Sequence, residues 1–468
     1  MPFPSYAFLF AFLPVALAGY FLCGRAGRHG ARLAPLWLGL ASLLFCLEAS
    51  GPYSLAALIL LAGSAYALGR PGGKGSPVPR LLCLLAFAAV LRQSDVMFLF
   101  HFCGTSIGRE SWGISSFAVP WAFSFVLLGQ AAYLVAVHRG GPASPSLASH
   151  LAWTLFFPRL PAGPPVSRES WDAQQALPGA FRFQPANMAA GLGLLASGLA
   201  KKVVLADNLS LLAQYFFDDL ARKGHPGIAF AWIGTLAFAF QIYFELSGYA
   251  DMALGAARMF NVVLPPVFDA PYRARSLSAF WSRWYAPLWR LGRELVPLAR
   301  PGLRPFAPVV AFLALGMWHG MNIPFLAWGA WSGAALAVQR SGRLPRVPGA
   351  VAWTATFLAV LAGWVLFRLG SEDDAGTVFA ALAGFRPAGE SLPAQIAALF
   401  QGTEAKEYGL AFLALAASPF AALLGPSSER RFGPEWRPTL AEALGTALLL
   451  ILSILCLPAA REFLYARF

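Results

Sequence analysis

The sequence is poor in charged residues. Only 12% of its 468 residues are Asp, Glu, Lys or Arg, whereas soluble domains carry about 25%. Hydrophobic residues make up 58% of the chain. This balance excludes an ordinary soluble domain and predicts a polytopic membrane protein in contact with the lipid bilayer. The net charge of +13 does not indicate nucleic-acid binding. Most of the Lys and Arg residues stand in short loops between apolar runs, where they orient spans and meet anionic headgroups.

Close cysteine pairs are missing as well. The five cysteines are scattered, and four of them lie inside or at the ends of apolar runs. Without a CxxC pair, neither a metal site nor a disulfide framework is expected, and each cysteine is interpreted as a small apolar residue. They are Cys23, Cys46, Cys83, Cys103 and Cys456.

Apolar runs recur along the whole chain. A bilayer-spanning helix needs about 20 mainly apolar residues, and the sequence predicts about ten to twelve membrane-embedded helices. The first run has no basic leader and no small-residue cleavage site, so we expect a retained span. The runs cover residues 5–23, 34–48, 52–69, 80–101, 117–137, 189–206, 228–247, 306–319, 323–340, 349–368, 408–425 and 439–458.

Basic residues follow every second run near the N-terminus. The turn between the second and third runs carries Glu48 and no basic residue. Because basic loops face the cytoplasm, we expect the N-terminus to lie outside. The basic loops follow the first, third and fifth runs, and carry Arg25, Arg28, Arg32, Arg70, Lys74, Arg80 and His138-Arg139.

Three regions interrupt the simple alternation of spans and loops. Residues 156–165 are apolar but rich in helix breakers, so they form either an interfacial loop or irregular backbone buried in protein. Residues 241–300 mix charged and aromatic side chains. Residues 369–407 are more polar and predict an external or interfacial insertion with a helix around 374–385.

Polar groups gather within the apolar helix predicted at 241–260. Inside a membrane such groups face the protein interior, a wet cavity or one another. They can serve as polar glue between helices, but three charges favour the wall of a polar cavity. The residues are Gln241, Glu245, Ser247, Tyr249, Asp251 and Arg258.

An amphipathic helix is predicted at 276–293, with Ser276 as its cap. Phe280, Trp281, Trp284 and Leu288 share one stripe. The arginines lie elsewhere on the helix, which is typical of a helix at the membrane interface. Either the helix only lies on the lipid surface, or its arginines help to bind an anionic acyl carrier. The arginines concerned are Arg283, Arg290 and Arg293.

One histidine stands in a segment where burial is expected. His319 lies between two apolar runs, flanked by Trp318 and Gly320. Neutral imidazole accepts a proton near physiological pH, so His319 is the best candidate for a general base. No Ser-x-Gly elbow, zinc-ligand pair or phosphate-binding glycine loop accompanies it. The other histidines are expected in loops, at loop edges or, for His101, at the interface; they are His29, His101, His138, His150 and His225.

Five segments together resemble the membrane-bound O-acyltransferases, in particular the bacterial branch of alginate O-acetylases and teichoic-acid D-alanyl transfer proteins. The resemblance covers nearly the whole chain. The segments are Phe156 to Pro164, Leu199 to Asn208, Tyr243 to Phe260, Trp318-His319-Gly320 with Trp328-Gly329, and Gly363 to Arg368.

The resemblance implies an all-α bundle of tilted and re-entrant helices around a central tunnel, in a bacterial inner membrane. It further implies that no cofactor is bound and that an acyl donor such as acetyl-CoA enters from the cytoplasm. His319 would be the base, and a polysaccharide or a periplasmic acyl-accepting protein would take the acyl group, as in alginate biosynthesis. We expect one domain over 1–468, with N-terminal helices in 1–140, a catalytic core in 141–345 and C-terminal helices in 346–468.

The sequence departs from the branch at a few positions. Tyr285 stands where a second histidine is usual, and it can donate a hydrogen bond but is no base near neutral pH, since its ordinary pKa is about 10. Glu245 replaces an aspartate. Asn322, three residues beyond His319, could orient the imidazole on a helical turn.

Other functions stay open on the sequence. One is D-alanyl transfer to an envelope polymer. Another is a diverged scaffold or acyl conduit of the same fold, which Tyr285 and the reduced stretch 292–302 favour. A third is a secondary transporter, against which the chain shows no internal repeat.

Overall fold

The computed structural model describes most of the chain. The described residues are 2–70, 78–91, 123–161, 163–220, 227–295, 305–320, 322–343, 345, 347–369, 375–385, 392–401, 405–425, 427–433, 436 and 438–461. Among them the regular secondary structure is helical, without a strand, which confirms the predicted all-α class. Residues 92–101 and 117–122 of two predicted spans, together with Lys74, Cys103, His225 and positions 296–302, lie outside this set.

Helices of membrane-spanning length confirm an integral membrane protein. Within the described part of the chain, six are long and apolar enough to cross a bilayer: Ala7–Gly24, Gly27–Ala49, Pro185–Asp218, Ile228–Met259, Gly349–Arg368 and Leu440–Ala459. Four shorter apolar helices cover Ser54–Leu68, Pro79–Ala88, Phe125–His138 and Ala307–His319. The central tunnel and the three-part division of the chain stay predictions.

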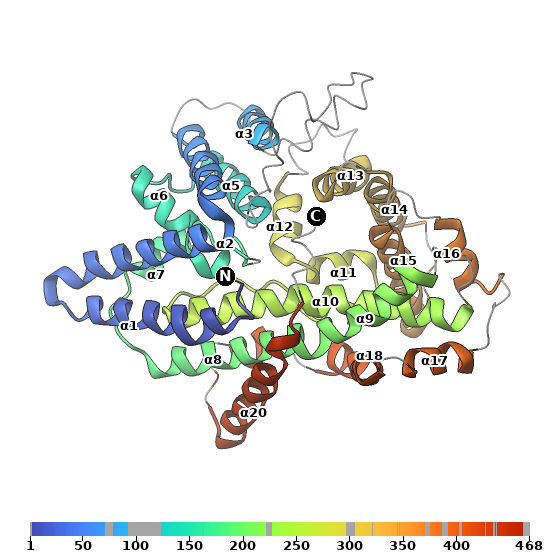
Figure 1. The fold of residues 1–468 in the computed structure, drawn as a ribbon. Helices are drawn as coiled ribbons and strands as arrows, with labels where there is room; N and C mark the ends of the chain where they lie inside the picture. The colour runs from blue at the N-terminus through green and yellow to red at the C-terminus, as the bar shows by residue number, and fades with distance from the viewer. Residues whose placement is uncertain are drawn as a thin grey trace, which may run out of the picture. The chain divides into compact units, whose positions relative to one another are not determined.

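The chain forms two compact units, interleaved along the sequence; Figure 1 shows its helices coloured in chain order. Unit 1 comprises Met1–Gly198, Tyr249–Val267 and Arg431–Leu450, and unit 2 comprises Leu199–Gly248, Phe268–Arg430 and Ile451–Phe468. The long helix α10 (Ile228–Met259) and helix α20 (Leu440–Cys456) each contribute to both.

Unit 1 is built from the N-terminal helices. They are α1 (Leu13–Gly24), α2 (Gly30–Leu68), α3 (Val78–Leu91), α5 (Phe123–His138), α6 (Leu147–Thr154), α7 (Arg168–Gln175) and α8 (Pro185–Leu199), with a π-helical turn at Ala7–Phe12. α2 contains a break at Gly51, whose φ of 77° suits a residue without a Cβ, and Pro52 follows it. The predicted separation of runs 34–48 and 52–69 is therefore confirmed.

The segment rich in helix breakers lies inside unit 1. Phe157–Arg159 form a short 3-10 helix, and the Phe157 ring is fully buried. It packs edge-on against Phe12 and Phe260, with ring centroids 5.0 and 5.6 Å away. The Phe157 N–H donates to Ser42 Oγ at 3.1 Å. The interfacial-loop interpretation is wrong, and the irregular backbone is buried in protein.

Unit 2 holds the remaining helices. After a π-helical stretch at Ala200–Ala206 come α9 (Asp207–Gln214), α11 (Leu277–Arg283), α12 (Ala286–Leu295), α13 (Ala307–His319), α14 (Ile323–Arg340), α15 (Gly349–Arg368), α16 (Ala375–Leu382), α17 (Leu392–Phe400) and α18 (Ala405–Leu423). Helix α16 confirms the helix predicted around 374–385. α13, α14 and α15 lie next to one another (Figure 1).

Candidate active site

The histidine segment belongs to a tightly packed helical hairpin. α13 and α14 approach each other through glycines: a Cβ at Gly316 would lie 2.3 Å from the Phe325 carbonyl oxygen, and one at Gly329 would lie 2.4 Å from the Phe312 carbonyl oxygen. Small residues let membrane helices come this close. The hairpin therefore fixes the end of α13 against the start of α14.

His319 is the last residue of α13, and aromatic rings surround it. Its ring centroid lies 4.9 Å from Phe367, 5.5 Å from Trp328 and 5.9 Å from Phe325. The side chain is half-buried, not fully buried as the sequence context predicts, and so is the neighbouring Trp318. An imidazole held by aromatic walls and partly open can meet a substrate hydroxyl.

Asn322 is not placed as predicted. α13 ends at His319 and α14 begins at Ile323, so the two residues do not share a helical turn. Asn322 caps α14 instead, with its side-chain oxygen accepting from the Phe325 N–H at 3.0 Å. Through Phe325 it supports one wall of the histidine's surroundings.

Aromatic contacts connect His319 with the predicted amphipathic segment. Phe367 packs edge-on against Trp364 at 5.9 Å, and Trp364 lies 4.8 Å from Trp284. Trp281 reaches Trp328 at 6.1 Å. The histidine segment and the amphipathic segment 276–293, which the sequence analysis described separately, thus lie close together in unit 2.

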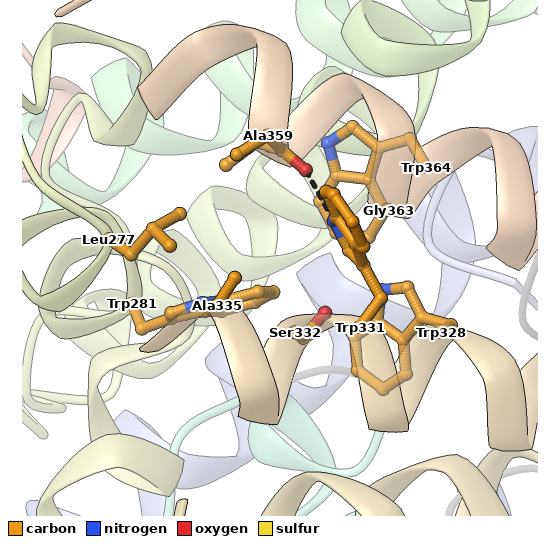
Figure 2. Close-up of a pocket in the computed structure, with 10 residues that line it drawn as sticks. Leu277, Trp281, Trp328, Trp331, Ser332, Ala335, Ala359, Gly363 and Trp364 are labelled. Atoms are coloured by element: carbon orange, nitrogen blue, oxygen red, sulfur yellow. Dashed lines mark hydrogen bonds between the residues drawn. The ribbon is translucent and has the colours of Figure 1, made fainter. Parts of the chain in front are cut away.

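A small apolar pocket lies among these rings (Figure 2). α11, α14 and α15 supply its walls, and the Trp331 indole N–H donates to the Ala359 carbonyl at 2.8 Å across it. Trp328 lines the pocket and also contacts His319. The lining residues are Leu277, Trp281, Trp328, Trp331, Ser332, Ala335, Ala359, Val360, Gly363 and Trp364.

Tyr272 connects α10 to α15, and sequence reasoning missed it. Its hydroxyl donates to the Ala239 carbonyl at 2.6 Å and accepts from the Trp364 indole N–H at 3.1 Å. The Trp353 indole N–H donates to its carbonyl at 2.8 Å. Burial raises the pKa of Tyr272 well above its usual range. A tyrosine in a Pro-Tyr-Arg turn carries no local signal for such a role, because all its partners are distant in sequence.

The predicted helix 276–293 is two helices. Ser276 caps α11 as predicted, accepting from the Ala279 N–H at 3.1 Å. The chain then breaks at Trp284 and Tyr285. The φ of Tyr285 is 42°, a left-handed value that is unfavourable for a bulky residue. Tyr285 is 8% exposed, and its ring lies 6.1 Å from Phe268. The break turns α12 away from the axis of α11.

The three predicted donor-binding arginines lie on this broken segment. Arg283 ends α11 and is half-buried, whereas Arg290 and Arg293 are exposed on α12. Leu291 on the same helix is buried. This is the amphipathic pattern that the sequence predicts, and the role of the arginines in donor binding stays a prediction.

Glu245 belongs to a buried ionic cluster. Lys202 is 0% exposed, and its Nζ lies 2.6 Å from Asp207 Oδ1 and 2.8 Å from Glu245 Oε1. The second Asp207 oxygen accepts from the Arg461 backbone N–H at 3.2 Å. Glu245 thus joins α10 to the π-helical stretch Ala200–Ala206, as expected of polar glue between helices. That it lines a polar cavity stays a prediction.

Four other polar residues of α10, Gln241, Ser247, Tyr249 and Asp251, are buried too, whereas Arg258 is half-buried. Ser247 belongs to unit 2, whereas Tyr249 and Asp251 belong to unit 1. Tyr249 stacks on Phe3, with ring centroids 6.5 Å apart. That they line a polar cavity stays a prediction.

His150 corrects the sequence interpretation of the other histidines. It was expected at a solvated loop edge, yet it is 0% exposed in unit 1. Its Nδ1 lies 2.8 Å from Ser144 Oγ, and its Nε2 lies 2.8 Å from Gln130 Oε1. Burial, together with Arg168 and Arg159 nearby, lowers the pKa of His150 to about 3. His29 is exposed and His138 half-buried.

Comparison with known proteins places the chain in a family. No family model matches it. It is 32% identical over 398 residues to a probable alginate O-acetylase of Pseudomonas fluorescens, covering 82% of this chain and 76% of that protein. A probable alginate O-acetylase of Pseudomonas putida is 30% identical over the full length of both. The peptidoglycan O-acetyltransferase of Helicobacter pylori is 31% identical, covering 81% of this chain and 79% of that protein. The chain belongs to the bacterial membrane-bound O-acyltransferases, in the branch of the alginate O-acetylases.

Proposed function

We propose that this O-acyltransferase moves an acetyl group from a cytoplasmic thioester donor, such as acetyl-CoA, toward a hydroxyl of an envelope or exported polysaccharide. The acceptor takes the acetyl group directly or through a periplasmic acyl-accepting protein. The observation that carries the proposal is His319 at the aromatic-walled end of α13. The named activities of the relatives, O-acetylation of alginate and of peptidoglycan, support the acetyl group and the polymer.

In this proposal His319 acts as the general base. It takes the proton of the acceptor hydroxyl as the new carbon–oxygen bond forms, and the carbon–sulfur bond of the donor then breaks. The thiolate that leaves takes the proton back. A positioned base contributes about 10²–10⁴-fold to such a step. The exposed Arg290 and Arg293 would attract the anionic donor at the cytoplasmic face.

The proposal also sets the orientation of the chain. Basic loops after the first, third and fifth spans would face the cytoplasm of a bacterial inner membrane, with the N-terminus outside. Labelling single cysteines introduced at Arg25 and Glu48 with a membrane-impermeant reagent in whole cells would test this. Modification at Glu48 and not at Arg25 is expected.

The test of function uses purified protein in nanodiscs with radiolabelled acetyl-CoA and the polymer made by the source cells. We expect His319→Ala to lower acetyl transfer by about 10²–10⁴-fold. Tyr285→Phe should lower it far less, since it removes a single hydroxyl and leaves the imidazole of His319 in place. The matched control is His29→Ala, an exposed histidine remote in sequence.

Two outcomes would contradict the proposal. Equal transfer by the wild type and His319→Ala at matched protein levels would remove the base assignment. No transfer by the wild type, but restored polymer acetylation when His319→Ala is expressed in deletion cells, would favour the scaffold or acyl conduit.

A further inference from the structure

A second pocket lies in unit 1, where α2 ends and the loop after α5 begins. Its cavity volume is about 430 Å³, a size typical of small-molecule sites. It lies at the C-terminal end of the apolar stretch Ser54–Leu68 of α2, which contributes Tyr66 to its lining. No acidic side chain is among its lining residues: Tyr66, Gly69, Arg70, Tyr133, Ala143, Ser144 and Pro145.

One wall of this pocket is held rigidly by a buried hydrogen-bond network. The Ser144 N–H donates to the Tyr133 hydroxyl oxygen at 3.1 Å. Gln130 Nε2 donates to Thr154 at 3.0 Å, so Gln130 Oε1 is the acceptor for His150 Nε2–H. His150 Nδ1 is then unprotonated and accepts the Ser144 hydroxyl proton. The backbone N–H and the hydroxyl of Ser144 therefore both donate to groups inside the protein.

The same network excludes Ser144 as a nucleophile. An activated serine needs a base that can hold the transferred proton. His150 is buried beside Arg159 and Arg168, and its pKa of about 3 keeps it neutral. The network holds this wall of the pocket in place and does not take part in acyl transfer.

Hydrogen-bond donors remain available among the tyrosines that line the pocket. The Tyr133 oxygen accepts from Ser144, but its own O–H has no acceptor among the described residues, although Tyr133 is 96% buried. Gly69 leaves room for this ring, since a Cβ there would lie 2.6 Å from it. The hydroxyl of Tyr66 accepts from Arg70 Nη2 at 3.2 Å and likewise keeps its proton.

Arg70 supplies the positive charge. Its guanidinium lies over the Tyr66 ring, 5.3 Å from the centroid. The single bond to Tyr66 uses one of its five N–H donors, and no carboxylate pairs with it among the described residues. A cation held over an aromatic ring, with tyrosine hydroxyls nearby and no acid, is complementary to an anion with several acceptor oxygens.

We infer that this pocket binds the phosphate group of a phosphate ester, with Arg70 as the charged ligand and the hydroxyls of Tyr66 and Tyr133 as further donors. Phosphate presents three or four acceptor oxygens to these groups. The aromatic rings would pack against the part of the ligand next to the phosphate. Two sources share this chemistry, an anionic phospholipid headgroup and a soluble nucleotide. The inference does not depend on the acyl-transfer proposal.

The test measures binding to the full-length protein with two probes. Native mass spectrometry in detergent compares the number of phosphatidylglycerol molecules bound with the number of phosphatidylcholine molecules bound. Calorimetry in nanodiscs made only of phosphatidylcholine measures the affinity for ADP. We expect Arg70→Gln to weaken the binding of at least one of the two probes by about tenfold or more, since hydrogen bonds to charged groups contribute strongly. Tyr133→Phe should weaken the same probe by a smaller factor. The matched control is Arg25→Gln, an exposed arginine of unit 1 that does not line the pocket.

The outcomes separate the sources. A loss confined to phosphatidylglycerol identifies a lipid headgroup site, a loss confined to ADP identifies a nucleotide site, and a loss of both shows a general phosphate-ester site. Equal effects of Arg70→Gln and Arg25→Gln would overturn the inference, because surface charge alone would then explain binding. Absence of binding to both probes would overturn it as well.

Discussion

The buried cluster of Lys202, Asp207 and Glu245 allows a sharp stability test, the substitution Lys202→Met. Methionine keeps the length of the side chain but removes its ammonium. The two contacts of 2.6 and 2.8 Å each correspond to an attraction of about 6 kcal/mol at an effective dielectric constant of about 20. Desolvation of the three ions offsets much of this gain, so the intact cluster contributes little net stability.

Removing the ammonium changes that balance. Asp207 and Glu245 would stay buried and lose the cation that both contact. Breaking a buried ion pair from one side costs about 3–5 kcal/mol, and we expect a loss of that size in the free energy of unfolding. Glu245→Gln should cost less, about 1–3 kcal/mol, because Lys202 keeps Asp207 as its partner.

The assay is unfolding of the purified protein in detergent, followed by size-exclusion chromatography after heating and by denaturant titration. Lys406→Met is the matched control, since Lys406 is exposed on α18 and should change the free energy by about 0.5 kcal/mol or less. The triple variant Lys202→Met, Asp207→Asn, Glu245→Gln should recover roughly half of the loss, because no ion stays buried. Equal stability of Lys202→Met and Lys406→Met would refute the reasoning.

Two further predictions concern packing and pH. Gly316→Ala should push α13 away from α14, because the new Cβ would lie 2.3 Å from the Phe325 carbonyl oxygen. We expect it to lower both acetyl transfer and thermal stability. Gly39→Ala is the control and should lower neither, since a Cβ there would meet nothing within 4 Å. His150 is neutral in the folded state, with a pKa of about 3, but takes a proton below about pH 6.5 when unfolded. Its contribution to stability is therefore complete above pH 6.5 and falls as the pH drops toward 3. Between pH 7.5 and 5, denaturant titrations should show the wild type losing about 2 kcal/mol more than His150→Gln; equal losses would contradict the low pKa.

Features that depend on local sequence could be predicted. The apolar runs predict the helices, and Ser276 predicts the start of α11. The Gly51-Pro52 pair marks the break in α2. His319 could be singled out because it stands between two apolar runs. Each of these signals is contained within a few residues of the position it describes.

Features that depend on distant partners could not be predicted. His150 has the polar surroundings of a loop edge in sequence, and only Gln130 and Ser144 together make its burial possible. Lys202 reaches Asp207 five residues on, through a π-helical stretch that brings residues i and i+5 together. Sequence reasoning that pairs positions four apart has no means of finding this contact.

Tyr285, which stands where the resemblance implies a second histidine, lies at the break between α11 and α12. The segment breaks there because the backbone adopts a left-handed conformation, which histidine tolerates better than most residues other than glycine, asparagine and aspartate. A tyrosine at the same position loses about 1–3 kcal/mol to strain. It keeps the conformation because Phe268 packs against its ring, while the preceding Trp284 packs against Trp364. The break therefore forms with a tyrosine at position 285, and with it the aromatic path from α11 to His319. The geometry around His319 thus does not require a second imidazole at position 285.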